Sequence, residues 1–160
     1  MTATAHPTGV LTGDVAPEFS LSSTAGTDVV LSSLRGKKNA LLAFFPLAFT
    51  STCTAEVCAL SEDFDKFAGA NTIVLPISVD SVPTLKEFKA KHAIKVELLS
   101  DFKRQVSCAY GTLNEAKFYS NRAYFLIDRA GRVRWAYHEP DNKQRRDDAE
   151  LLRQIAALGA

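Results

Sequence analysis

The stretch NALLAFFPLAFTSTCTAEVC, residues 39–58, decides the fold, because a buried strand turns into a helix within it. Residues 39–47 are mostly apolar and show no alternation, which is typical of a central strand that is buried on both faces. From Ser51 to about Gly69, apolar residues recur at three- and four-residue spacing, which predicts a helix. A buried strand that leads directly into a helix is typical of an α/β fold.

The rest of the chain continues this alternation of strands and helices. A second apolar run over residues 72–80 predicts another buried strand, and residues 81–93 predict an amphipathic helix that opens with a serine and carries a proline in its first turn. Residues 122–138 predict two strands joined by a turn. Together these elements predict a mixed central sheet with helices on both faces. Shorter strands are predicted within 13–21, 27–34 and 96–101, and shorter helices within 102–111 and 146–159.

The composition is that of a single globular domain. The chain has 160 residues, of which 46% are hydrophobic and 23% are charged, and its net charge is +1. We expect a flexible tail over residues 1–12 and one domain over residues 13–160. The near-neutral charge predicts neither a nucleic-acid partner nor a membrane partner, and the longest apolar run, residues 40–48, is too short to span a bilayer.

The N-terminal stretch predicts a cytoplasmic location. It has no basic segment followed by an apolar core of the kind that directs export. In a reducing compartment, cysteines serve as free thiols, metal ligands or catalysts more often than as structural disulfides. The three cysteines of this chain are therefore expected to be free thiols, ligands or catalysts.

Cys53 lies just after the predicted switch from strand to helix. Backbone N–H groups in the first turn of a helix lack partners and carry partial positive charge, which lowers the pKa of a thiol there and favours the thiolate. The ends of buried strands are also where open α/β sheets place their functional sites. A reactive cysteine is favoured over the alternative, a small apolar residue that fills the core.

Two neighbours of Cys53 allow two interpretations each. The hydroxyl of Thr50, three residues earlier, is placed either to cap the helix or to point at a ligand on the sulfur. Pro46 either ends the strand only, or also makes the turn rigid and helps to shield a thiolate from water.

These residues form a known pattern. Pro46, Thr50 and Cys53 make P-x-x-x-T-x-x-C, and Glu56 extends it to T-x-x-C-x-x-E, which resembles the active-site signature of the peroxiredoxins. The stretch up to Cys53 resembles the AhpE-like branch of that family, and residues 121–137, NRAYFLIDRAGRVRWAY, are similar to its later hairpin. The resemblance implies a thioredoxin-like fold and a thiol peroxidase.

The resemblance also implies a role for each residue. Cys53 would be the nucleophile that attacks the peroxide, with Thr50 orienting the peroxide and Pro46 shielding the site. Arg122 matches the arginine of the family's later strand, and its guanidinium would stabilise the thiolate and donate to the transition state. Glu56 would support an arginine. No metal, flavin or nucleotide cofactor is implied.

Cys58 raises the question of how the oxidised Cys53 is reduced. A cysteine five residues after the nucleophile resembles the resolving cysteine of the PrxQ or bacterioferritin-comigratory branch, whereas AhpE-like relatives usually lack it. In an intact helix the two Cα atoms would lie roughly 8–9 Å apart, beyond the reach of a disulfide at about 7 Å. A Cys53–Cys58 disulfide therefore requires the helix to unwind. The alternative is that Cys58 is a core residue. Cys108 is expected to be buried or partly buried, with a second resolving role left open.

The predicted function is reduction of hydrogen peroxide and organic hydroperoxides through a sulfenic acid on Cys53. This acid is resolved as a Cys53–Cys58 disulfide, which a thioredoxin-like protein reduces. One alternative is a one-cysteine peroxidase served by a low-molecular-weight thiol, and another is a peroxide-sensing redox module that contacts a partner. A disulfide oxidoreductase is disfavoured because its C-x-x-C is absent, and a zinc site is disfavoured because two cysteines five residues apart on one helix diverge. The sequence leaves a monomer and a homodimer equally open.

Overall fold

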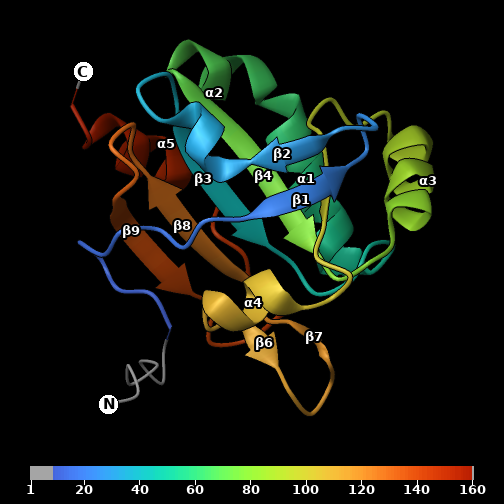
Figure 1. Ribbon diagram of the computed structural model, residues 1–160. Helices are drawn as coiled ribbons and strands as arrows, with labels where there is room; N and C mark the ends of the chain where they lie inside the picture. The colour runs from blue at the N-terminus through green and yellow to red at the C-terminus, as the bar shows by residue number, and fades with distance from the viewer. Residues whose placement is uncertain (1–8, 160) are drawn as a thin grey trace, which may run out of the picture.

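The structure, a computed structural model, describes residues 9–159 and contains one main sheet and one small one (Figure 1). The strands are β1 (Ser20–Ser23), β2 (Asp28–Val30), β3 (Asn39–Phe44), β4 (Thr72–Ser78), β5 (Leu99–Ser100), β6 (Leu113–Asn114), β7 (Tyr119–Ser120), β8 (Ala123–Ile127) and β9 (Val133–His138). The main sheet has seven strands in the order β2-β1-β5-β4-β3-β8-β9. Strands β3, β4 and β5 are parallel and the remaining pairs are antiparallel, so the predicted mixed sheet is confirmed.

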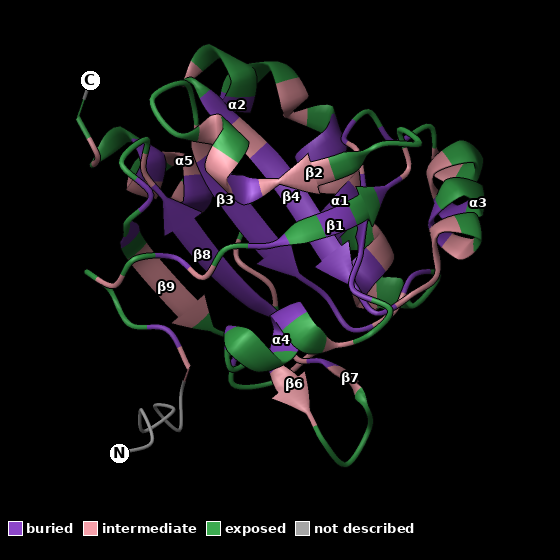
Figure 2. Ribbon diagram, viewed as in Figure 1, coloured by how far each residue is buried: buried purple, intermediate pink, exposed green. Residues whose placement is uncertain are grey.

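Strand β3 lies inside the sheet and is buried on both faces, as the unbroken apolar run predicts. Its side chains alternate between two core clusters, with Leu41 and Ala43 in the first and Leu42 and Phe44 in the second. Figure 2 shows β3, β4 and β8 buried along most of their length, whereas β9 at the edge is only partly buried. The central strands thus form a rigid platform for the loops at their ends.

The two faces of the main sheet are covered by different elements. The helices are η1 (a 3₁₀ helix, Leu31–Leu34), α1 (Ser51–Glu62), α2 (Phe64–Gly69), α3 (Val82–His92), α4 (Gln105–Ala109) and α5 (Asp148–Ala156). Residues of α1, α2, α3 and α5 build the first core cluster, which lies on the face turned away from the viewer in Figure 1. The near face is covered by the β1–β2 hairpin, η1 and the short α4.

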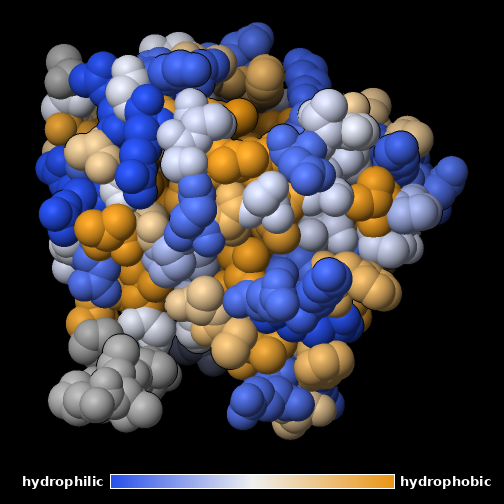
Figure 3. Space-filling view, in the orientation of Figure 1, coloured by the Kyte–Doolittle hydropathy of each residue, from blue (hydrophilic) through white to orange (hydrophobic). Residues whose placement is uncertain are grey.

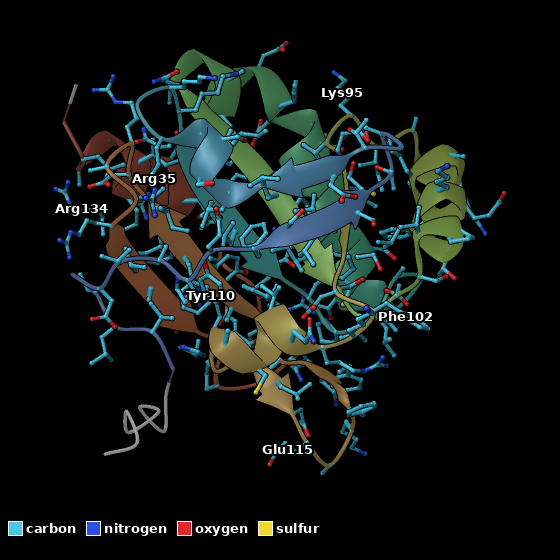
Figure 4. All side chains as sticks on the ribbon, viewed as in Figure 1. Arg35, Lys95, Phe102, Tyr110, Glu115 and Arg134 are labelled. Carbon is cyan, nitrogen blue, oxygen red and sulfur yellow. The ribbon has the colours of Figure 1, made fainter. Side chains whose placement is uncertain are left out.

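Tyr110 directly follows α4 and belongs to the second core cluster (Figure 4). Its ring packs edge-to-face on Phe125 at 5.1 Å between centroids and lies 5.5 Å from Phe44. Its buried hydroxyl donates to the carbonyl of Pro17 at 2.7 Å, which ties the segment before β1 to the core.

Several predicted elements differ in their bounds from what the sequence indicates. The helix predicted over 51–69 is divided at Asp63, which ends α1 and precedes α2. The strand predicted within 27–34 pairs only as far as Val30, because the chain then turns into η1. The strand predicted within 13–21 begins only at Ser20.

The hairpin of β6 and β7 was not predicted, because two-residue strands carry no periodic pattern. Arg104 holds it against the segment before α4. The guanidinium lies 4.2 Å from the ring centroid of Phe118 and 5.7 Å from that of Phe102, and Nε donates to the Phe118 carbonyl at 3.0 Å. Figure 4 shows Phe102 at one side of α4 and Glu115 near the tip of the hairpin.

At the N-terminus, residues 1–8 of the predicted tail lie outside the described residues. Val10 is 7% exposed and belongs to the second core cluster, so the packed chain includes this residue. Within residues 9–159, no helix combines the length and the apolar character needed to cross a membrane. Figure 3 shows mostly hydrophilic residues along the upper and left edges of the near face and hydrophobic residues toward its middle.

Candidate active site

Cys53 lies in the first turn of α1, directly after the loop that leaves β3 (Figure 1). The loop is fixed at two points: the backbone N–H of Phe45 donates to the Ile77 carbonyl at 2.9 Å, and that of Ala48 donates to the Asp80 carboxylate at 2.8 Å. Cys53 is only 1% exposed, so the sulfur lies in a place with little water. A thiolate there depends on protein donors for its stabilisation.

Arg122 supplies one such donor. Its Nη2 lies 3.2 Å from the sulfur of Cys53, and its Nη1 lies 2.7 Å from Oε1 of Glu56. Strand pairing explains the contact, because Phe44 at the end of β3 pairs with Ala123, the residue after Arg122. The Arg122 and Glu56 side chains are 1% and 2% exposed, so this ion pair is buried. The structure therefore brings Cys53, Glu56 and Arg122 together.

Glu56 accepts on both of its oxygens. Tyr124 donates its hydroxyl to Oε2 at 2.6 Å, opposite the bond that Arg122 makes to Oε1. Burial raises the pKa of the Glu56 carboxyl, while Arg122 and Tyr124 oppose that rise. The two donors, one on each oxygen, favour the carboxylate form. Burial and the Glu56 charge raise the pKa of Tyr124, which keeps its hydroxyl protonated as a donor.

The loop between β9 and α5, residues 139–147, also contacts the site. The carbonyl of Asn142 accepts from Nε and Nη2 of Arg122 at 3.3 and 2.9 Å. The backbone N–H of Arg146 donates to the hydroxyl of Tyr124 at 2.9 Å. Sequence reasoning missed both Tyr124 and Asn142. The position of Tyr124, two residues after Arg122 on one strand face, was a usable signal, whereas Asn142 gave none.

Pro46 and Thr50 lie in the loop between β3 and α1. Pro46 is buried just beyond the end of β3. Thr50 occupies the N-cap position of α1, but its side chain makes no capping bond there, so the capping interpretation is wrong. Its hydroxyl instead donates to the Leu47 carbonyl at 2.7 Å and is exposed. A peroxide contact of Thr50 and a shielding role of Pro46 stay predictions.

The three cysteines are free thiols in different surroundings. Cys58 is partly buried on α1, and burial together with the nearby charge of Glu62 raises the pKa of its thiol. Cys108 is exposed, so the expectation that it is buried or partly buried is wrong: it lies on the outer side of α4, while Val106 and Ser107 face inward. Within residues 9–159 no group of three or more His, Cys, Asp or Glu side chains could hold a metal ion.

The AhpC/TSA family model matches residues 12–136. The chain belongs to the AhpC/TSA family. Alkyl hydroperoxide reductase E of Mycobacterium tuberculosis is 40% identical to it over 126 residues, which are 78% of this chain and 82% of that protein. Peroxiredoxin Bcp of Escherichia coli is 34% identical over 133 residues, which are 79% of this chain and 85% of that protein.

Solved structures agree with this AhpC/TSA assignment. The reduced 2-Cys peroxiredoxin of Plasmodium vivax superposes with a TM-score of 0.86 at 34% identity, covering 93% of this chain and 82% of that one. The predicted thioredoxin-like fold and the resemblance to peroxiredoxins are thus confirmed, and this AhpC/TSA protein is an enzyme of the peroxiredoxin type. Its relatives carry the names of both branches that the sequence resembles.

Proposed function

We propose that the chain reduces hydrogen peroxide and organic hydroperoxides with the thiolate of Cys53. The observation that carries this proposal is the 3.2 Å contact between Nη2 of Arg122 and the buried sulfur. A thiolate that is shielded from water and held by a charge-assisted donor is oriented to attack a peroxide. The printed name of the relative at 40% identity, alkyl hydroperoxide reductase E, supports an organic hydroperoxide as one substrate class.

In the first step the Cys53 thiolate attacks one oxygen of the peroxide and the O–O bond breaks. Cys53 becomes a sulfenic acid, and the other oxygen leaves as hydroxide or alkoxide, which takes up a proton to give water or an alcohol. Negative charge moves from sulfur to the leaving oxygen during this step. Arg122 and the free backbone N–H groups at the start of α1 are placed to stabilise that charge.

In the second step the thiol of Cys58 condenses with the sulfenic acid, giving a Cys53–Cys58 disulfide and water. Both residues lie on the continuous helix α1, so the helix has to unwind first. Several features of α1 favour unwinding: its N-cap residue makes no side-chain capping bond, its first turn carries no acidic residue and its last turn carries no basic one. The residues between Ser51 and Cys58 include two threonines and a valine, which are mediocre helix formers.

In the third step a thioredoxin-like protein reduces the disulfide in the cytoplasm. One observation favours the alternative of an external low-molecular-weight thiol: the pKa of Cys58 is raised by burial and by Glu62, which makes it a slow attacking group at neutral pH. A peroxide-sensing module is the further alternative, in which oxidation of Cys53 changes a partner contact instead of sustaining turnover.

Intact mass under non-reducing conditions tests the proposal. Reduced protein is treated with one equivalent of hydrogen peroxide and digested to map the linkage. Loss of two hydrogens with Cys53 joined to Cys58 supports the intramolecular route, and a stable gain of one oxygen on Cys53 supports the external thiol. The Cys58→Ser variant is the matched control and should stop at the added oxygen. No change within seconds would contradict the peroxidase proposal.

A further inference from the structure

Asn142 forms hydrogen bonds with both the backbone and the guanidinium of Arg122. The side-chain Oδ1 of Asn142 accepts from the backbone N–H of Arg122 at 2.8 Å. The backbone carbonyl of the same residue accepts from Nε and Nη2 of the Arg122 guanidinium. One residue therefore fixes where the arginine side chain starts and how its charged group is turned.

These hydrogen bonds matter because the orientation of the guanidinium decides which acceptors its N–H groups contact. Arginine carries its donors in a rigid planar fork at the end of a flexible stem. Asn142 occupies the Nε edge, Glu56 occupies Nη1, and the remaining direction of Nη2 leads to the sulfur of Cys53. If the Nε edge is released, the fork can still pair with Glu56 while it turns away from Cys53.

Asn142 is itself held by its surroundings. Its Nδ2 donates to Oδ1 of Asn121 at 3.0 Å, next to a second donor, Nδ2 of Asn114, at 3.2 Å on the same oxygen. Further along the loop, Arg146 pairs with Glu139 at 2.9 Å. The loop is thus fixed on either side of Asn142 before it meets Arg122.

We propose that Asn142 is a positioning residue, which aims Arg122 at Cys53 and thereby sets how readily the Cys53 thiolate forms and reacts. The inference rests on the proposed function, because it gives Arg122 its task. Asn142 touches no reacting atom and acts only through Arg122. A segment outside the signature motif therefore controls the reactivity of the cysteine inside it.

The test compares Asn142→Ala with Asn114→Ala in a chain that carries Cys58→Ser and Cys108→Ser, so that only Cys53 reacts. The first readout is the pH profile of Cys53 alkylation by iodoacetamide, and the second is the rate of its oxidation by hydrogen peroxide. Asn142→Ala keeps the backbone carbonyl but removes the side-chain bonds to the Arg122 N–H and to Asn121 that hold this carbonyl in place. We therefore expect the profile to move to higher pH and the oxidation rate to fall about tenfold or more, because a small misplacement of a catalytic group has effects of this size. Asn114→Ala removes a bond to the same Asn121 oxygen without touching Arg122 and should change neither readout.

Arg122→Gln distinguishes failure of the positioning role of Asn142 from failure of the proposed role of Arg122. If Arg122→Gln changes the profile and the rate but Asn142→Ala leaves both as they are, the positioning role is overturned and the proposed function stands. If Arg122→Gln changes neither, the proposed role of Arg122 fails and the inference fails with it. Equal effects of Asn142→Ala and Asn114→Ala also overturn it, since they would indicate general loosening. Should Asn142→Ala fail to fold, Asn121→Ala removes the support of Asn142 together with the bond from Asn114, and it should move both readouts in the same direction by a smaller amount, which Asn114→Ala alone should not do.

Discussion

Nη1 of Arg122 and Oε1 of Glu56 lie 2.7 Å apart with almost no exposed surface on either side chain. Removing one partner of a buried ion pair leaves the other charge without compensation, which costs about 3–5 kcal/mol of stability. We therefore expect Glu56→Gln to lower the free energy of unfolding by an amount near 3 kcal/mol, measured by urea denaturation. Glu62→Gln, on the same helix but exposed, is the control and should cost under about 0.5 kcal/mol. Equal small losses in both variants would show that the pair is not a stabilising contact.

Arg122 should be irreplaceable by lysine. Lysine keeps the positive charge but lacks the planar fork that meets Cys53, Glu56 and the Asn142 carbonyl at once. Loss of one transition-state donor costs about 10²–10³ in rate, so we expect Arg122→Lys to slow oxidation by hydrogen peroxide at least about a hundredfold. The comparison is Arg134→Lys, an exposed arginine of β9, which should react at the normal rate. A normal rate in Arg122→Lys would mean that charge alone is sufficient.

Asp148 should make the protein less stable as the pH rises. It is 8% exposed, neither of its oxygens has a donor partner within residues 9–159, and it lies next to the Asp63 carboxylate. Burial and Asp63 raise the pKa of Asp148 from 3.8 to about 7, with Glu56 adding to the rise and Arg145 opposing it. The protonated group can donate to Asp63, which joins the break between α1 and α2 to the start of α5.

The sign of the effect follows from proton uptake. Between pH 4 and about 7 the folded state keeps a proton on Asp148 that the unfolded state has lost, so stability falls through this window and levels off above it. Asp148→Asn cannot titrate and should lose this part of the pH dependence. At pH 8 its free energy of unfolding should exceed that of the wild type by on the order of 1–2 kcal/mol, because solvent screens part of the repulsion between Asp148 and Asp63. Parallel stability curves for the two proteins between pH 4 and 8 would refute this.

Disulfide formation should depend on the ionisation of Cys58. Burial and then Glu62 raise the pKa of its thiol, so at neutral pH only a small fraction is the attacking thiolate. After a rapid pulse of peroxide, the rate of disulfide formation should rise with pH up to and beyond pH 8. Glu62→Gln removes the nearby negative charge and should accelerate the step about twofold at pH 7. A rate that is independent of pH would instead indicate that unwinding of α1 limits the step.

The sequence predicted the platform well, because the apolar runs that form β3 and β4 and the switch to α1 follow simple periodicity. It also placed Cys53 at a helix start without any structural information. Arg122 was different, because only the resemblance to the peroxiredoxins pointed to it. In the structure it is 1% exposed, a burial that depends on long-range pairing of β8 with β3.

The remaining parts of the site come from contacts that no local pattern records. Asn142 lies in an irregular loop and contacts Arg122 only because β9 and α5 bring the loop back to the start of β8. The break at Asp63 likewise falls within a pattern that favours one continuous helix. Both features are set by tertiary packing, which overrides local propensity.

Cys53 should be the residue that reduces peroxide, and single-turnover peroxide consumption measures this without any reductant. Fully reduced protein is mixed with one equivalent of hydrogen peroxide without any reductant, and the remaining peroxide is measured over seconds. We expect the wild type and Cys58→Ser each to consume the equivalent of peroxide, whereas Cys53→Ser consumes none. Undiminished peroxide with the wild type, or equal consumption by Cys53→Ser, would contradict it.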